Sequence, residues 1–139
     1  MMENLQIDTG VKRLMINGDE SRVLEFNPED IVFAEKFYQL NKNFEQKAEE
    51  LELTAERLER EATLDENGVP SNLKEQIQTT LDLCNYLREQ IDLVFGTGTS
   101  QMLFGETQNM NMFEQFFNGI VPYIKQARSK KVAQYRKKD

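Results

Sequence analysis

The residues of this chain that could do chemistry are carboxylates, one thiol and a glycine-rich loop. The sequence holds 24 Asp and Glu, a single cysteine, Cys84, and no histidine. Without histidine the usual general base near neutral pH is missing, and a Ser-His or Cys-His nucleophile and a histidine-containing zinc site are excluded. The carboxylates are spread among lysines and arginines, as is typical of solvated helix faces. The sequence therefore predicts a protein that is not an enzyme, with no catalytic residue, metal site or cofactor.

The loop Gly96-Thr97-Gly98-Thr99-Ser100 has the composition of a phosphate-binding loop but not its pattern. A Walker loop ends in Gly-Lys-Ser/Thr, and no lysine follows here. A dinucleotide-binding loop follows a strand, whereas the residues before Gly96 have a helical period. We interpret the loop as a helix stop and a turn, with Gly96, Gly98 and Gly105 as hinge residues.

The elements that position these residues are expected to form one domain over 1–139 and a mainly α fold. An N-terminal β-hairpin is followed by a long antiparallel helical hairpin and a C-terminal helix. The predicted bounds are 11–26 for the β-hairpin, 28–65 for the long helix, 72–95 for the second helix, 100–104 for a short helical turn and 112–135 for the C-terminal helix.

Local signals set these bounds. Asn17-Gly18 is a strong hairpin turn, whereas residues 1–10 show no period and are expected to fray. Because a lone hairpin is marginal in water, it must pack on the helices or on the strands of another copy. The sequence leaves that choice open.

Capping residues indicate the helix starts. Asn27-Pro28 is expected to begin the long helix, and the pairs Asn72–Glu75 and Asn111–Glu114 have capping-box spacing. Thr99 or Ser100 is expected to cap the short turn. Pro122 lies inside the last helix, so a kink or break is expected near 119–122.

Charge and hydropathy describe a soluble chain. The formal net charge is −7, and the mean hydropathy is −0.64. No apolar run approaches the ~20 residues needed to cross a bilayer. A single cysteine fits a reducing compartment, so we expect a cytoplasmic protein without a membrane partner.

The charge is unevenly distributed. The long helix is acidic, and residues 125–138 carry seven Lys and Arg. This basic end can complement the helix dipole, contact an acidic protein or, less in keeping with the net charge, contact nucleic acid. Head-to-tail contact between copies, weakening as salt rises, is a further hypothesis.

Phenylalanine and methionine are concentrated near Phe104-Gly105. Such residues form either an ordinary core or an adaptable apolar surface for a partner. The candidate partner-binding residues are Met102, Phe104, Met112, Phe113, Phe116 and Phe117. Whether this cluster is a closed core or an open surface is left open.

The order of these segments resembles the small tail assembly chaperones of long-tailed phages and prophages of Gram-positive hosts. The best marker of this resemblance is the occurrence of two Phe-Gly dipeptides, at 95–96 and 104–105. An aromatic helix with the residues Phe113-Glu114-Gln115-Phe116-Phe117 follows them. The similarity covers most of residues 11–128.

The resemblance implies a non-enzymatic role in the cytoplasm of the bacterial host. Such a protein binds and solubilises the tape measure protein, assists assembly of the tail tube protein around it, and tends to form homo-oligomers. The resemblance transfers no functional residue to this chain. Two alternatives remain: a structural coiled-coil adaptor or minor virion component, and a nucleic-acid-associated protein.

Overall fold

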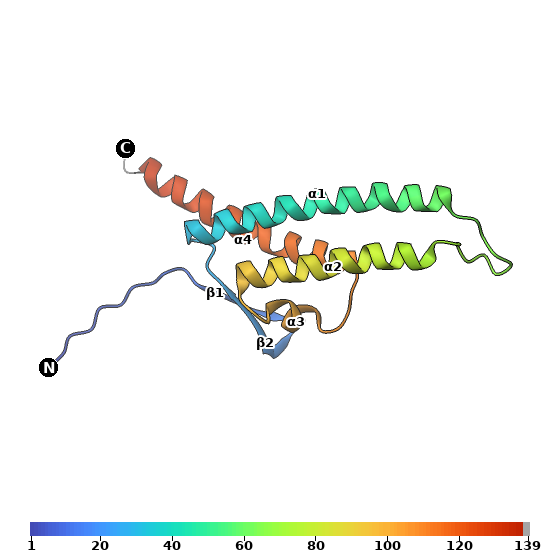
Figure 1. The fold of residues 1–139 in the computed structure, drawn as a ribbon. Coiled ribbons are helices and arrows are strands. Elements are labelled where there is room, and N and C mark those ends of the chain that lie inside the picture. The colour runs from blue at the N-terminus through green and yellow to red at the C-terminus, as the bar shows by residue number, and fades with distance from the viewer. Residues whose placement is uncertain (138–139) are drawn as a thin grey trace.

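The computed structural model describes the backbone of residues 1–137 and the side chains of residues 1–129. The element order is β1 (Lys12–Ile16), β2 (Asp19–Phe26), α1 (Ile31–Glu61), α2 (Leu73–Phe95), α3 (Thr99–Phe104) and α4 (Met110–Lys137). An N-terminal antiparallel hairpin followed by helices confirms the predicted fold class. Figure 1 shows α1 and α2 as a long antiparallel pair, with α3 and the hairpin beside the end of α2.

The hairpin has the turn that Asn-Gly predicts. Asn17 and Gly18 have φ angles of 54° and 73°, the positive values that a tight two-residue turn between strands needs. Leu14 pairs with Leu24, and the register shifts between Met15 and Ile16. The return strand starts at Asp19, directly after the turn. β1 pairs with β2 of the same chain, and β2 packs on the chain's own helices.

The first helix spans Ile31–Glu61 rather than the predicted 28–65. The Asn27 side chain accepts hydrogen bonds from the backbone N–H groups of Glu29 and Asp30, so it stabilises a turn around buried Pro28 instead of capping a helix. Asp30 is the true N-cap and accepts from Val32 N at 3.0 Å. Two competing cap residues lie three positions apart, and the second one begins the helix.

The loop between α1 and α2 is a compact turn rather than a simple linker. The Asp65 carboxylate accepts hydrogen bonds from the N–H groups of Asn67 and Val69, at 2.8 and 2.9 Å. Leu64 and Pro70 form an isolated antiparallel bridge, which draws residues after Glu61 out of the helix. This explains why α1 ends before residue 65.

Asn72 precedes α2 but does not form the predicted capping box with Glu75. Its amide nitrogen donates to Leu58 O at 2.7 Å, and its amide oxygen accepts from Gln76. The hydrogen bond from Asn72 to Leu58 of α1 thus takes the place of the expected capping-box bonds between Asn72 and Glu75.

The last helix spans Met110–Lys137 rather than 112–135, and Asn109 caps it in place of Asn111 by accepting from Met112 N at 2.8 Å. The helix continues through Pro122 without a break, and the expected kink near 119–122 stays a prediction. Asn118 and Pro122 both lie on the exposed face. Water can therefore satisfy the carbonyl that the proline leaves without a donor.

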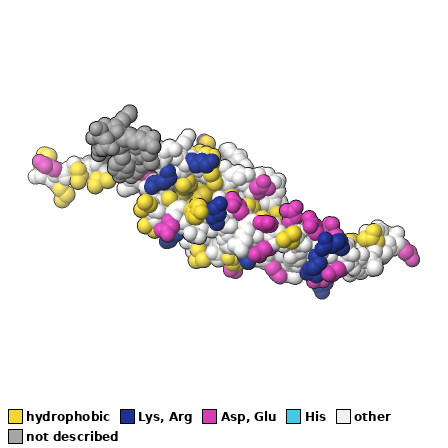
Figure 2. Space-filling model, turned by 90° about the horizontal axis from the view of Figure 1, so that it is seen from above, with side chains coloured by type: hydrophobic (Ala, Val, Ile, Leu, Met, Phe, Trp, Pro, Cys, Tyr) yellow, Lys and Arg dark blue, Asp and Glu magenta, His cyan; other side chains and the backbone are white. Residues whose placement is uncertain are grey.

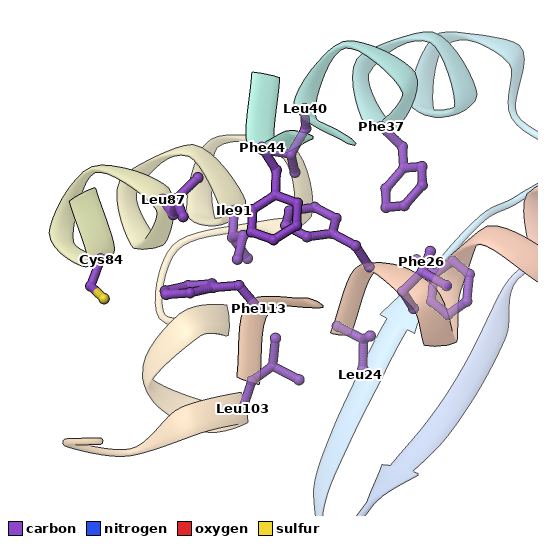
Figure 3. Packing of buried hydrophobic residues seen from close by; sticks show 12 residues of the cluster. Leu24, Phe26, Phe37, Leu40, Phe44, Cys84, Leu87, Ile91, Leu103 and Phe113 are labelled. Carbon is purple, nitrogen blue, oxygen red and sulfur yellow. The ribbon is translucent and has the colours of Figure 1, made fainter. Parts of the chain in front are cut away.

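The core lies where α1, α2, α4 and the hairpin meet (Figure 3). Phe44 and Phe117 stack with their ring centroids 4.7 Å apart, joining α1 to α4. The fully covered cluster consists of Leu24, Phe26, Phe37, Leu40, Phe44, Cys84, Leu87, Ile91, Leu103, Phe113, Phe117 and Ile120. The outer part of the α1–α2 pair, residues 45–83, is here called the arm. Leu58 is the buried large apolar side chain of the arm.

Candidate partner-binding site

The six candidate residues divide into two groups. Phe113 and Phe117 are 0% and 1% exposed, so they belong to the closed core. Met102, Phe104, Met112 and Phe116 are only partly buried. The cluster is therefore partly closed core and partly open surface. One face of α4 is buried in the core, and the neighbouring face is open.

The open face forms one wall of a cavity of about 540 Å³ between α4 and the β-hairpin. We call this cavity the apolar groove. Phe104, Met112 and Phe116 line it, whereas Met102 does not. The remaining lining residues are Leu14, Met15, Ile16, Asn17, Leu24, Leu103, Thr107, Gln115, Gly119, Ile120 and Tyr123. None of these side chains is charged, and Asn17, Thr107 and Gln115 add polar groups to the apolar lining, so the groove suits an uncharged segment with an apolar face rather than an anion or a metal ion.

A glycine on α4 helps to keep the groove open. Gly119 is exposed, and no atom lies within 4 Å of the position that a Cβ would occupy. A side chain at this position would therefore begin in open space at the lining of the groove. The glycine, which lowers helix stability, thus leaves room for an occupant.

The loop after α2 ends the helix and turns, as its glycines predict. Gly96, Gly98 and Gly105 have φ angles of 119°, 87° and 60°, where side chains other than glycine are strained. Motion at these three residues stays a prediction. Three charged side chains, which the sequence interpretation did not single out, hold the turn in place.

Asp92 is the first of them. Its carboxylate accepts hydrogen bonds from Ser100 N at 2.7 Å and from Ser100 Oγ at 3.3 Å. It therefore caps α3 from the end of α2, while the residue at the cap position, Gly98, has no side chain. The predicted caps Thr99 and Ser100 lie inside α3.

Arg88 is the second. Its guanidinium donates to Gln108 Oε1 at 2.7 Å, to Gly105 O at 2.8 Å and to Thr107 O. It also lies over the Phe104 ring, 5.6 Å from the centroid. One side chain thus fixes the loop between α3 and α4 and a groove-lining aromatic ring.

Arg22 is the third, and it ties the hairpin wall of the groove to α3. Its Nε donates to Met102 O at 2.9 Å, and its Nη2 donates to Leu103 O at 2.7 Å. These two carbonyls are among the last four of α3, which have no partner within the helix. The hairpin wall is therefore held in position relative to α3.

Cys84 is fully buried in the core, and burial raises the pKa of its thiol, with the nearby Arg88 charge opposing the shift. An unfolded thiol has a pKa of about 8.5. The unfolded chain therefore loses this proton first as the pH rises, and the Cys84 contribution to folding stability falls above about pH 8.5.

We accordingly expect the free energy of unfolding to fall more from pH 7 to pH 9.5 in the wild type than in Cys84→Ala, measured by urea titration at each pH. A thiol reagent should modify Cys84 only after unfolding. Equal pH dependence in both proteins, or rapid modification of the native protein, would contradict this.

Other site chemistries find no support in the part of the chain that the structure describes. No group of three Asp, Glu, Cys or His there could hold a metal ion. Among the described helices, none is both long and apolar enough to cross a membrane.

A known protein family matches most of the chain. Residues 17–138 match a family described as "Family of unknown function (DUF6673)". Comparisons with curated proteins and with solved structures give no match.

Proposed function

The chain belongs to the DUF6673 family, whose function is unknown, and from this starting point we propose that it is a non-enzymatic phage tail assembly chaperone. In this proposal it binds and solubilises the tape measure protein in the bacterial cytoplasm and assists tail tube assembly. The observation that carries the proposal is the uncharged apolar groove, lined by Phe104, Met112 and Phe116.

The chemistry of the groove fits a long apolar helix as the occupant. Amphipathic helices bind by placing their apolar face in a groove, and aromatic rings supply most of the contact area. Methionine adapts to different side chains, which suits a client that presents many similar but unequal stretches. The lack of charge in the lining favours an apolar stripe over a specific polar ligand.

The charged surface supports the same role. Between residues 45 and 66 there are nine Asp and Glu and three Lys and Arg. Acidic side chains gather on the arm, with basic ones among them, in the view of Figure 2. Excess negative charge would keep a complex of many copies and an apolar client in solution.

A structural coiled-coil adaptor is the second candidate, and one surface favours it. On the arm, Leu73, Ile77 and Leu81 line a cavity of about 480 Å³, and the Ile77 side chain is 58% exposed. A partner helix placed there would complete a three-helix bundle. Stable retention of the chain in finished particles would favour this candidate, because a chaperone leaves.

Co-expression with a phage tape measure protein tests the proposal. We expect the client to be soluble with the wild-type chain and insoluble without it. Gly119→Trp should abolish the rescue by filling the groove from an exposed position. If the client is equally insoluble with and without the wild-type chain, the proposal fails.

Gly119→Ala is the matched control. It should keep the rescue and raise the free energy of unfolding by about 0.5–1 kcal/mol, because alanine is the better helix former. Urea unfolding followed by circular dichroism measures this. A Gly119→Ala variant that is less stable than the wild type would mean that the glycine is needed for folding rather than for open space.

A further inference from the structure

Residues 2–8 form an extended segment that lies apart from the body of the molecule (Figure 1). Leu5 and Ile7 are 83% and 74% exposed. In an extended chain these two side chains point to one side, while Asn4, Gln6 and Asp8 point to the other. The segment thus has the pattern of a half-buried strand, but its apolar side is uncovered.

The same molecule has an uncovered place for such a strand. In the described part of the chain, β1 pairs with β2 alone, so the outer edge of β1 has no strand partner. Leu14 and Ile16 of β1 line the apolar groove. A strand added to the edge of β1, with Leu5 and Ile7 on the same face as these residues, would place both side chains in the groove.

Charge favours the same pairing. Residues 1–11 carry Glu3 and Asp8 and no Lys or Arg, whereas β1 begins with Lys12 and Arg13, both exposed. An acidic strand beside a basic edge is attracted to it, whereas two copies of β1 would repel each other.

The path of the chain directs the segment away from its own groove. The Asn27 amide donates to Thr9 O at 2.6 Å, and Gly10 has a φ of 91° with the Glu29 side chain filling the space where a Cβ would be. These contacts fix the chain just before β1. To reach its own β1 edge, the segment would have to reverse direction at these fixed residues.

We propose that residues 2–8 add as a strand to β1 of a second copy, with Leu5 and Ile7 in the apolar groove of that copy. Reciprocal exchange of the two segments closes a symmetric dimer. The exchange does not depend on the client. That a client displaces the exchanged segment from the groove rests on the proposed function.

Disulfide cross-linking in a Cys84→Ala background tests the exchange. Tagged Leu5→Cys protein is mixed with untagged Ile16→Cys protein and oxidised, and the expected product is a mixed disulfide dimer. Leu5→Cys mixed with Leu93→Cys, which is 74% exposed on α2, is the control and should give none. Equal yields from the two mixtures overturn the proposal.

The double variant Leu5→Cys, Ile16→Cys in one chain tests the competing intramolecular contact. A disulfide within the chain, at monomer mass, overturns the proposal. Separately, Leu5→Asp with Ile7→Asp should weaken self-association about 100-fold or more, because two apolar side chains would no longer be buried. Light scattering over a range of protein concentrations measures the self-association. If the average mass of the double variant equals that of the wild type at every concentration, the proposal is overturned. None of these measurements uses the client, so failure of the client rescue is a separate result.

Discussion

We expect Phe117→Ala to lower the free energy of unfolding by about 3–5 kcal/mol, the usual cost of truncating a fully buried phenylalanine. Phe117 is 1% exposed and lies against three other rings. Its ring centroid is 4.7 Å from that of Phe44, 5.3 Å from Phe116 and 6.0 Å from Phe37. Because these rings come from α1 and α4, the cavity would open where the two helices meet.

Urea unfolding followed by helical circular dichroism measures this loss, with Leu93→Ala as the control. Leu93 is 74% exposed, and its truncation should change the free energy by no more than about 0.5 kcal/mol. If the two variants unfold at the same urea concentration, the packing of α4 on α1 described above is wrong.

We expect Arg88→Met to lower the free energy of unfolding by about 2–4 kcal/mol, because methionine keeps an apolar stem but leaves the Gln108 side chain and three backbone carbonyls without their charged donor. These carbonyls belong to Ser100, Gly105 and Thr107. The loop from 105 to 109 should then become a site of proteolysis, because this side chain ties it to α2.

The matched control is Arg57→Met. Arg57 and Glu61 form an exposed pair at 3.1 Å on α1, worth about 0.3–0.5 kcal/mol. Limited proteolysis with mapping of the first cut distinguishes a local from a global effect. A first cut in the 62–72 loop in both variants would show that Arg88 does not restrain the 105–109 loop.

Local signals in the sequence account for most of the fold. The Asn17-Gly18 turn and the glycines at 96, 98 and 105 each depend on a few neighbouring residues, and each has a positive φ as expected of such turns. The helix starts were predicted less accurately, because at a helix start two side chains can compete for the N-cap position. At the first helix Asn27 forms a turn and Asp30 forms the cap.

The candidate site was predicted only in part, because helix periodicity shows which side chains share a face but not which of them another element covers. Phe113 and Phe117 proved to be core, and Phe116 borders the groove. The opposite wall comes from Leu14 and Ile16, far away in the sequence. No local pattern connects these residues to α4.

The charged residues that hold the site were missed for the same reason. Arg22, Arg88 and Asp92 look like ordinary surface charges in the sequence, yet their partners are backbone atoms of α3 and the loop after it. One signal was available: Arg88 and Asp92 lie four residues apart, on one face of α2, shortly before the glycines at 96 and 98.

The placement of the core gives the two ends of the helical pair unequal resistance to opening. Aromatic residues pack the base of the pair, whereas in the arm Leu58 is the buried large apolar side chain and Asn72 donates a hydrogen bond across the pair to Leu58 O. Amide hydrogens of the arm should therefore exchange with solvent much faster than those around Leu87 and Ile91. The arm is then a separate cooperative unit, which can separate and close again while the groove at the base keeps its shape.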